Sequence, residues 1–267
     1  IAVIPAFEPT AVLEQVVRQL CKCEPTIRIV VIDDGSTTKT AIEVFISLEK
    51  YKNVKVLRHA ENLGKGKALK TGFQYLVDQE VNVGTVVALD ADGQHLAKDA
   101  IKVMRSSTET GMPTLGVRTF GKNTPLKSFL GNRASSFFLR LFLGIRLGDT
   151  QTGLRAIPAG LLPELIGVPG ERYDYELRQL TQVLVPQGLI EVSISTIYVD
   201  GNSGSHFSPI LDSMRIYWVM CRHLIVSLFI FVLLHFIFTA FCSKKKHFII
   251  FFNILRKIEN SYRHTCI

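Results

Sequence analysis

The stretch VVALDADGQH, residues 86–95, runs from a short aliphatic segment into two carboxylates and then into Gly93. A short, β-branched apolar run that a glycine closes is typical of a buried strand. Asp90 and Asp92 would therefore lie where the strand ends, and a buried carboxylate is costly without a partner. Two such carboxylates fit a divalent cation, Mg²⁺ or Mn²⁺, to which Gln94 can add an amide oxygen.

The chain around this stretch alternates between strand-like and helix-like patterns. The sequence predicts strands at 1–6, 27–34, 54–59 and 85–92, and helices at 10–23, 40–51 and 66–79. This alternation indicates a parallel sheet with helices on both faces, in which ligands bind beyond the carboxyl ends of the strands. The alternation weakens past residue 110. There we expect helices at 131–145 and 171–184, a loop at 148–158 and a strand at 190–201.

Small or polar side chains stand at four predicted strand ends. They are Pro5 and Ala6, Asp33 and Asp34, Arg58 and His59, and Asp90 to Asp92. Two of these groups are acidic pairs, which would repel an anionic ligand unless a cation lies between them. The carboxylates of Asp33 and Asp34 can cap a helix. Because one cap needs only one of them, a ribose or a base that donates hydrogen bonds to them is the alternative.

Basic residues gather in two further settings. The stretch NLGKGKALKTG, residues 62–72, is glycine-rich and opens a helix, but it does not fit a Walker loop. It is either a turn before a solvated basic face, or a loop whose Gly64 and Gly66 let a phosphate approach the backbone. Arg118, Arg133 and Arg155 each stand near a glycine. They are surface arginines if they lie apart, and a phosphate clamp if they converge.

The charge of the chain is concentrated in its last residues. The net charge is +8 over 267 residues, but residues 243–267 hold six Lys or Arg and one Glu, which leaves +3 for residues 1–242. Because positive and negative charges nearly cancel over residues 1–242, nucleic acid is not the expected partner. The five cysteines are odd in number and lack a zinc-ligand spacing, so we expect reduced thiols. The first residues read as a strand, and we expect no signal peptide.

The twenty residues 224–243 contain no Asp, Glu, Lys or Arg. About 20 apolar residues span a bilayer as a helix, so we expect a membrane-spanning or inserted helix, with a buried core helix as the alternative. The expected organisation is a catalytic domain at 1–212, an amphipathic juxtamembrane segment at 213–223, the membrane helix, and a basic tail at 244–267. The apolar run at 248–255 within the tail is too short to span and suits an interfacial helix.

Seven stretches together resemble bacterial family-2 glycosyltransferases, in particular the polyprenyl-phosphate glycosyltransferases, which are similar to dolichol-phosphate mannose synthase. They are IPAFEP, VIDDGST, NLGKGKALKTG, LDADGQH, GNRASS, DTQTGLRAIP and YVDGNSGSHFSPILDSMRIY. The resemblance implies an α/β fold of the GT-A type, Rossmann-like with a mostly parallel sheet, followed by a C-terminal membrane helix. Two features depart from the family. Phe7 stands where a tyrosine is common, and one apolar segment stands where related fused proteins carry four membrane helices.

The resemblance also implies an activity and its residues. The activity is metal-dependent, inverting transfer of a hexose, glucose or mannose, from a nucleotide diphosphate sugar to a polyprenyl phosphate of the undecaprenyl type. It would take place on the cytoplasmic face of the plasma (inner) membrane, with UDP-glucose as the first donor to test. The nucleotide sugar is expected at Pro5, Ala6, Glu8, Asp33, Asp34, Lys65, Asp90, Ala91 and Asp92, the Mg²⁺ or Mn²⁺ at Asp90, Asp92 and Gln94, and the transfer site at Arg118, Arg133, Asp149 and Arg155.

Within the transfer site, Arg118 and Arg133 are expected to meet the acceptor phosphate. A phosphate monoester is largely dianionic at neutral pH, so it has little need of a base to remove a proton. We therefore expect Asp149 chiefly to position an arginine or the acceptor. The donor base, the sugar and the oligomeric state stay open.

Two other functions remain as alternatives. A haloacid-dehalogenase-type phosphatase also uses Asp-x-Asp at a strand end with Mg²⁺, but that motif usually continues with Gly-Thr near the N-terminus. Here Gln94 and His95 follow, after three earlier strands. A catalytically inactive, membrane-anchored nucleotide-sugar-binding protein would keep the same motifs without the transfer.

Overall fold

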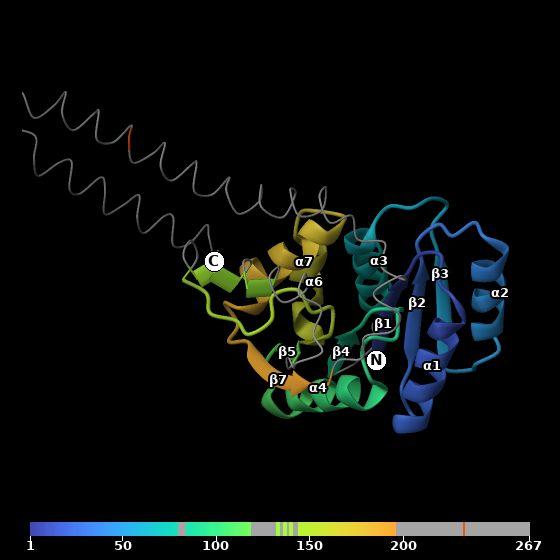
Figure 1. Ribbon diagram of the computed structural model, residues 1–267, viewed down its shortest axis with the longest axis horizontal. Coiled ribbons are helices and arrows are strands. Elements are labelled where there is room, and N and C mark those ends of the chain that lie inside the picture. The colour runs from blue at the N-terminus through green and yellow to red at the C-terminus, as the bar shows by residue number, and fades with distance from the viewer. Residues whose placement is uncertain are drawn as a thin grey trace, which may run out of the picture.

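A single mixed sheet forms the centre of the computed structural model, which describes residues 1–79, 84–118, 132–133, 136–137, 139–140, 144–195 and 232. Within these residues the sheet has seven strands in the order β3-β2-β1-β4-β6-β5-β7 (Figure 1). The strands are β1 (Ala2–Ala6), β2 (Ile29–Asp33), β3 (Val54–Arg58), β4 (Thr85–Ala88), β5 (Thr114–Arg118), β6 (Arg155–Pro158) and β7 (Ile190–Ile194). All described strands run parallel except β6, which is antiparallel to β4 and β5.

Helices cover both faces of this sheet. They are α1 (Ala11–Cys23), α2 (Lys39–Leu48), α3 (Lys65–Asp78), α4 (Ala97–Thr110), α6 (Leu162–Gly167) and α7 (Tyr173–Gln179), with a 3₁₀ turn η1 (Ala159–Leu161) and a π-helical turn η2 (Leu180–Leu184). The core on one face joins α1, α2 and α4, and the core on the other joins α3, α6 and α7 (Figure 1). Strands β1, β2 and β4 are buried throughout, as strands covered on both faces must be.

The sequence explains why α1 forms where it does. Thr10 precedes the helix, and its side chain accepts a hydrogen bond from the amide of Val12. Leu13, Val16, Val17 and Leu20 then recur at helical spacing, and all four are buried in the core. Burial of such side chains stabilises the fold by about 1.5–3 kcal/mol each. An N-cap and one apolar stripe therefore place α1 on the sheet.

The parallel half of the sheet brings strand ends to one edge. In register, Ala6 at the end of β1 faces Asp33 of β2, and Asp33 faces Arg58 of β3. Strand β6 runs in the opposite direction and begins at this edge. Its first residue, Arg155, pairs with Ala88 at the end of β4. Strand β5 runs to Arg118 on the same side. The chain thus leaves the sheet after β5 and re-enters it in β6 at the edge where ligands are expected.

The prediction of a mostly parallel sheet between two layers of helices is confirmed. The prediction of a loop over 148–158 is wrong for its last four residues, which form β6. A four-residue strand between two neighbours is held by hydrogen bonds to those strands. It is too short to show a clear alternation of apolar and polar residues in the sequence. The helix expected at 171–184 is α7 followed by η2, and β7 begins the strand expected at 190–201.

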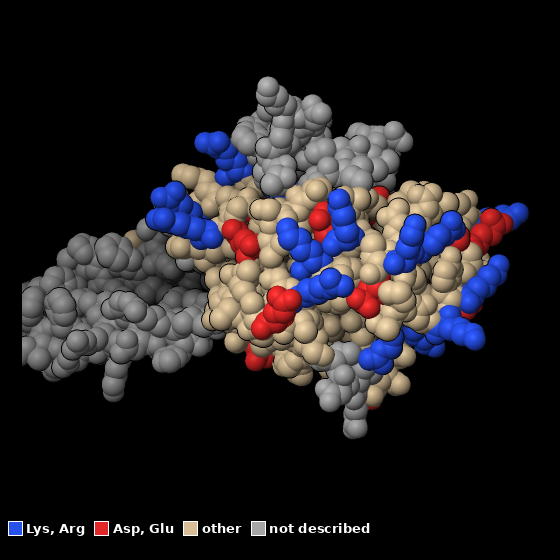
Figure 2. Space-filling model, turned by 90° about the horizontal axis from the view of Figure 1, so that it is seen from below, with Lys and Arg blue, Asp and Glu red and all other residues tan. Residues whose placement is uncertain are grey.

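Several predictions concern residues outside the described part of the chain. These include most of the helix expected at 131–145, and the segments 213–223, 224–243 and 244–267 apart from residue 232. No helix in the described part is both long and apolar enough to cross a bilayer. The face seen in Figure 2 mixes both signs of charge, with Asp and Glu set among Lys and Arg.

Candidate functional site

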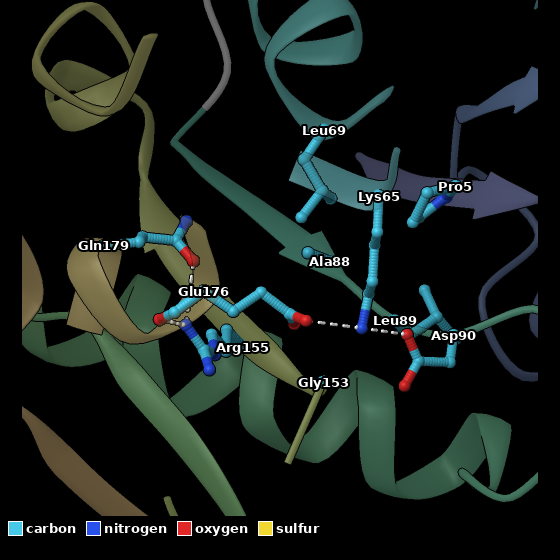
Figure 3. Close-up of a pocket in the computed structure, with 10 residues that line it drawn as sticks. All are labelled: Pro5, Lys65, Leu69, Ala88, Leu89, Asp90, Gly153, Arg155, Glu176 and Gln179. Carbon is cyan, nitrogen blue, oxygen red and sulfur yellow. Dashed lines mark hydrogen bonds and ion pairs between the residues drawn. The ribbon is translucent and has the colours of Figure 1, made fainter. Parts of the chain in front are cut away.

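A pocket lies at the carboxyl ends of β1 and β4, where the start of α3 meets α7 (Figure 3). Its lining consists of Pro5, Lys65, Leu69, Ala88, Leu89, Asp90, Gly153, Arg155, Glu176 and Gln179. Four of these, Pro5, Lys65, Asp90 and Arg155, were predicted site residues. The fold therefore brings together residues from four separate motifs at the edge that a parallel sheet offers to ligands.

Two glycines on either side of Lys65 determine how closely α3 approaches α7. Gly64 has φ +102°, and a Cβ there would lie 2.6 Å from the carbonyl oxygen of Glu171. A Cβ on Gly66 would lie 2.5 Å from Cβ of Tyr175. The sequence left open whether these glycines admit a phosphate. In the structure they admit the segment that begins α7, and so they bring α7 opposite Lys65.

Lys65 lies between two carboxylates (Figure 3). Its Nζ is 2.7 Å from Oδ1 of Asp90 and 2.9 Å from Oε2 of Glu176. Burial alone would lower the pKa of Lys65, but the charges of Asp90 and Glu176 raise it above its ordinary value. Burial likewise opposes ionisation of Asp90, yet the Lys65 ammonium holds the pKa of Asp90 below its ordinary value. Lys65 and Asp90 are therefore both charged at neutral pH.

Asp92 lacks such compensation. Burial, and then the charge of Asp90, raise the pKa of Asp92 to about 6. Its Oδ1 accepts a hydrogen bond of 3.0 Å from the amide of Gln94, in the turn that Gly93 closes. A divalent cation shared with Asp90 would relieve this repulsion. Among the described residues no group of three or more His, Cys, Asp or Glu could hold a metal ion, and the donor set of Asp90, Asp92 and Gln94 stays a prediction. Two carboxylates and an amide oxygen are donor types that suit Mg²⁺ or Mn²⁺ when substrate oxygens complete the shell.

A second ion pair lies beside the pocket. Arg118, at the end of β5, places Nε 2.5 Å from Oδ2 and Nη2 2.9 Å from Oδ1 of Asp149. The amides of Arg118 and Gln151 donate to the same two oxygens, at 3.3 Å and 3.0 Å. Asp149 is fully buried. Its carboxylate is thus held in a bidentate pair, as expected for a group that orients an arginine.

Asp90 and His95 connect the pocket to this ion pair. A Cβ on Gly153 would lie 2.3 Å from Oδ2 of Asp90, so the segment that follows Asp149 packs directly on the Asp90 carboxylate. His95 is buried, with Nε2 3.8 Å from the same oxygen. Burial lowers the pKa of His95, which keeps the imidazole neutral at pH 7. The pocket and the ion pair are therefore neighbouring parts of one site.

The three predicted arginines have different surroundings. Arg155 is buried in the pocket wall, where Nη1 donates to the carbonyl oxygen of Glu176 at 2.6 Å and to Oε1 of Gln179 at 2.9 Å. As far as the structure describes it, the lining includes Arg155 but neither Arg118 nor Arg133. Arg133 is exposed. A phosphate clamp made of all three arginines stays a prediction.

The predicted nucleoside residues organise the loops around the ends of β1 and β2. Asp34 accepts hydrogen bonds from Nδ1 of His59 at 2.7 Å and from the amides of Leu63 and Gly64 at 3.0 Å and 2.8 Å. Because these bonds occupy both of its oxygens, Asp34 holds the loop that begins α3. Contact of Asp34 with a ribose or a base stays a prediction.

Glu8 and Asp33 contribute to the same framework. Glu8, at φ +48°, accepts hydrogen bonds from the amides of Thr37 and Thr38, and these bonds lower the pKa of Glu8. Oδ1 of Asp33 accepts from the amide of Ser36 at 2.9 Å. Ala91 lies in the turn between the two acidic residues of the strand end. The loops after β1 and β2 are thus bound to each other beside the pocket.

Sequence reasoning missed three residues that the structure places at the site. Glu176 and Gln179 are three apart on α7, and both line the pocket. Asn132 is buried and binds the segment around Asp149, donating to the carbonyl oxygen of Gly148 at 3.0 Å and accepting from the amide of Thr150 at 3.0 Å. Spacing on a helix can indicate a shared face, but it does not say what that face meets.

Residues 1–153 match the glycosyl transferase family 2 domain. The chain belongs to this family. It is 29% identical over 220 residues to the UDP-N-acetylglucosamine–dolichyl-phosphate N-acetylglucosaminyltransferase of Methanococcus voltae, covering 74% of this chain and 85% of the relative. It is 23% identical over 211 residues to the polyprenol monophosphomannose synthase of Mycolicibacterium smegmatis, covering 76% and 78%. This family-2 member thus has relatives named for transfer to dolichyl or polyprenyl phosphate.

The fold also resembles that of solved structures. Glucosyl-3-phosphoglycerate synthase of Mycobacterium tuberculosis with phosphoglyceric acid superposes with a TM-score of 0.60 at 19% identity, covering 83% of this chain and 78% of that one. The same enzyme with Mn²⁺, UDP-glucose and phosphoglyceric acid gives a TM-score of 0.55 at 20% identity, covering 85% and 77%. At this identity the likeness establishes the GT-A-type α/β fold.

Proposed function

We propose that this family-2 glycosyltransferase moves a hexose, glucose or mannose, from a nucleotide diphosphate sugar to a polyprenyl phosphate, with inversion at the anomeric carbon. The reaction takes place at the cytoplasmic face of the plasma membrane and depends on Mg²⁺ or Mn²⁺. The observation that carries the proposal is the pocket at the ends of β1 and β4, where Lys65, Asp90 and Arg155 come together in a chain whose relatives act on lipid phosphates.

The charges of the site support this assignment. Lys65 and Arg155 present two cations to the pocket, which suits the diphosphate of a donor. Asp90, Asp92 and Gln94 would hold the divalent cation, which when bound offsets the negative charge of that diphosphate. A relative in fold binds UDP-glucose together with Mn²⁺, and UDP-glucose is therefore the first donor to test.

The ion pair beside the pocket suits the acceptor. In an inverting transfer, an oxygen of the acceptor phosphate forms a bond to the anomeric carbon while the bond to the diphosphate breaks on the opposite side. Arg118 is held in one orientation by Asp149, so its guanidinium is a fixed positive charge, which suits an anionic acceptor such as a phosphate. Because Asp149 already accepts four hydrogen bonds, it orients Arg118 and has a minor part in proton removal.

The test is a panel of nucleotide sugars incubated with membranes that contain the full chain, with and without Mn²⁺. We expect radiolabelled sugar to enter the organic phase with one donor and to stay in the aqueous phase for the Asp90→Asn variant. Binding of nucleotide and Mn²⁺ without any lipid product would instead identify an inactive binding protein. Release of inorganic phosphate from a phosphomonoester would identify a phosphatase.

A further inference from the structure

Glu176 gives Lys65 a second carboxylate that the proposed function does not use. It lies on α7, more than one hundred residues after Lys65, and its Oε2 is 2.9 Å from Nζ, on the other side of the ammonium from Asp90 (Figure 3). The side chains of Lys65, Asp90 and Glu176 are 17%, 27% and 13% exposed, so the three charges interact with little solvent between them. One ammonium faces two carboxylates.

This arrangement meets a requirement of the candidate metal site. Oδ1 of Asp90 is the atom that Lys65 contacts, and Asp90 is also a candidate ligand for the divalent cation. A cation at Asp90 would repel the Lys65 ammonium, because like charges a few ångströms apart interact strongly where water is excluded. A buried ammonium that loses its partner is costly. Lys65 can stay in place only if another carboxylate compensates it.

We propose that Glu176 is a positioning residue, which holds the Lys65 ammonium in the pocket when Asp90 exchanges Lys65 for a divalent cation. The inference rests on the proposed function for the meaning of the cation site. The same residue also holds the second cation of the pocket, since its carbonyl oxygen accepts from Nη1 of Arg155 at 2.6 Å. Helix α7 thus orients both positive groups that face the donor.

A double-mutant cycle on Mn²⁺ affinity tests this role. The full chain in detergent is titrated with Mn²⁺ alone, and free Mn²⁺ is read from its electron paramagnetic resonance signal, for wild type, Lys65→Met, Glu176→Gln and the double variant. We expect Glu176→Gln to weaken binding about 10-fold, because Lys65 then has Asp90 as its partner. Lys65→Met should restore affinity about 10-fold in the Glu176→Gln background and change it less than about 3-fold in wild type, a non-additivity typical of one network.

A control variant separates this role from a general effect of charge. Asp174→Asn removes the same charge from the same helix, and Asp174 pairs with Arg178 at 3.5 Å. We expect its Mn²⁺ affinity to stay within about twofold of wild type. If Glu176→Gln fails to fold, Glu176→Asp, which keeps the charge but shortens its reach, takes its place in the cycle with a smaller effect expected.

Four results would overturn the inference: no saturable Mn²⁺ binding by wild type, unchanged affinity in Glu176→Gln, an equal effect of Lys65→Met in both backgrounds, or a loss in Asp174→Asn as large as in Glu176→Gln. Failure of the proposed function looks different. In that case no donor yields a lipid product, while the Mn²⁺ cycle still shows coupling between Lys65 and Glu176, and the inference stands.

Discussion

At the scale of single residues, Asp92 is a candidate metal ligand whose carboxyl also affects the free energy of unfolding of the protein. Its pKa is about 6 in the folded protein and about 4 in an unfolded chain. Between these pH values the folded protein holds a proton that the unfolded chain has released, so this carboxyl lowers the free energy of unfolding as pH rises from 4 to 6. Above pH 6 the folded protein carries the full penalty of a buried charge.

We expect Asp92→Asn to stabilise the metal-free protein at pH 7.5 and to leave its stability nearly unchanged at pH 4. The difference between these two pKa values corresponds to about 3 kcal/mol, but Asp92 is half-buried and lies beside the charge of Asp90, so about 1–2 kcal/mol is expected. Sugar transfer should fall at least about 100-fold. Thermal melts in EDTA at both pH values measure the first effect, with the exposed Asp78→Asn as control. A lower melting temperature at pH 7.5 would contradict this account.

The ion pair of Arg118 and Asp149 leads to a second prediction at this scale. Asp149→Asn leaves the Arg118 guanidinium without its charged partner, so the free energy of unfolding should fall by about 3 kcal/mol. Transfer should slow at every pH while the acidic limb of the pH–rate profile stays near the pKa of the acceptor phosphate. The measurement is kcat against pH with a short prenyl phosphate. Disappearance of that limb, with acceptor binding intact, would make Asp149 a general base.

At the scale of elements, the first half of the fold could be predicted and the second half only in part. Strands β1, β2 and β4 are largely apolar runs and β3 contains three aliphatic residues in five, with helices of ordinary length between them, so local pattern specifies these strands. Strand β6 has four residues, and only its pairing with β4 and β5 distinguishes it from a loop. Lys65 and Asp90 stand in local sequence motifs, so they could be predicted. The place of Glu176 at the site is set by how closely α7 packs on α3, which no local pattern shows.

Gly66 controls that packing and gives a prediction for the element pair. In Gly66→Ala the new Cβ meets Cβ of Tyr175 at 2.5 Å, so α3 and α7 must separate. We expect a loss of about 1–3 kcal/mol in the free energy of unfolding, as for other overpacked sites, together with reduced sugar transfer. Gly160→Ala is the matched control, because its Cβ meets nothing within 4 Å. Equal melting temperatures for the two variants would show that α7 can move without cost.

At the scale of the whole molecule, the described domain and the C-terminal region differ in composition. Residues 1–242 carry a net charge of +3, and residues 243–267 carry +5 directly after the apolar segment 224–243. Basic residues beside an apolar segment favour contact with anionic lipid. We therefore predict that the C-terminal region attaches the protein to the membrane and that the described α/β domain carries out the transfer.

A chain that stops before Leu224 tests this division. We expect it to leave the membrane fraction and to keep transfer to a short, soluble prenyl phosphate, while transfer to a long-chain lipid in vesicles falls. Flotation with vesicles and the two transfer assays measure these effects, with the full chain as reference. A truncated chain that no longer melts cooperatively would show that residues 224–243 belong to the core.

The return of the chain to the same edge of the sheet predicts that the segment between β5 and β6 can be exchanged as a unit. Residues 119–154 begin after β5 and end before β6, two strands that pair with each other. Insertions and exchanges are tolerated where their two ends lie close together. A chimaera that takes residues 119–147 from a relative with another acceptor should therefore adopt the relative's choice of lipid and keep its own donor, because Lys65, Asp90 and Glu176 stay in place. Acceptor variety can then evolve on one donor site.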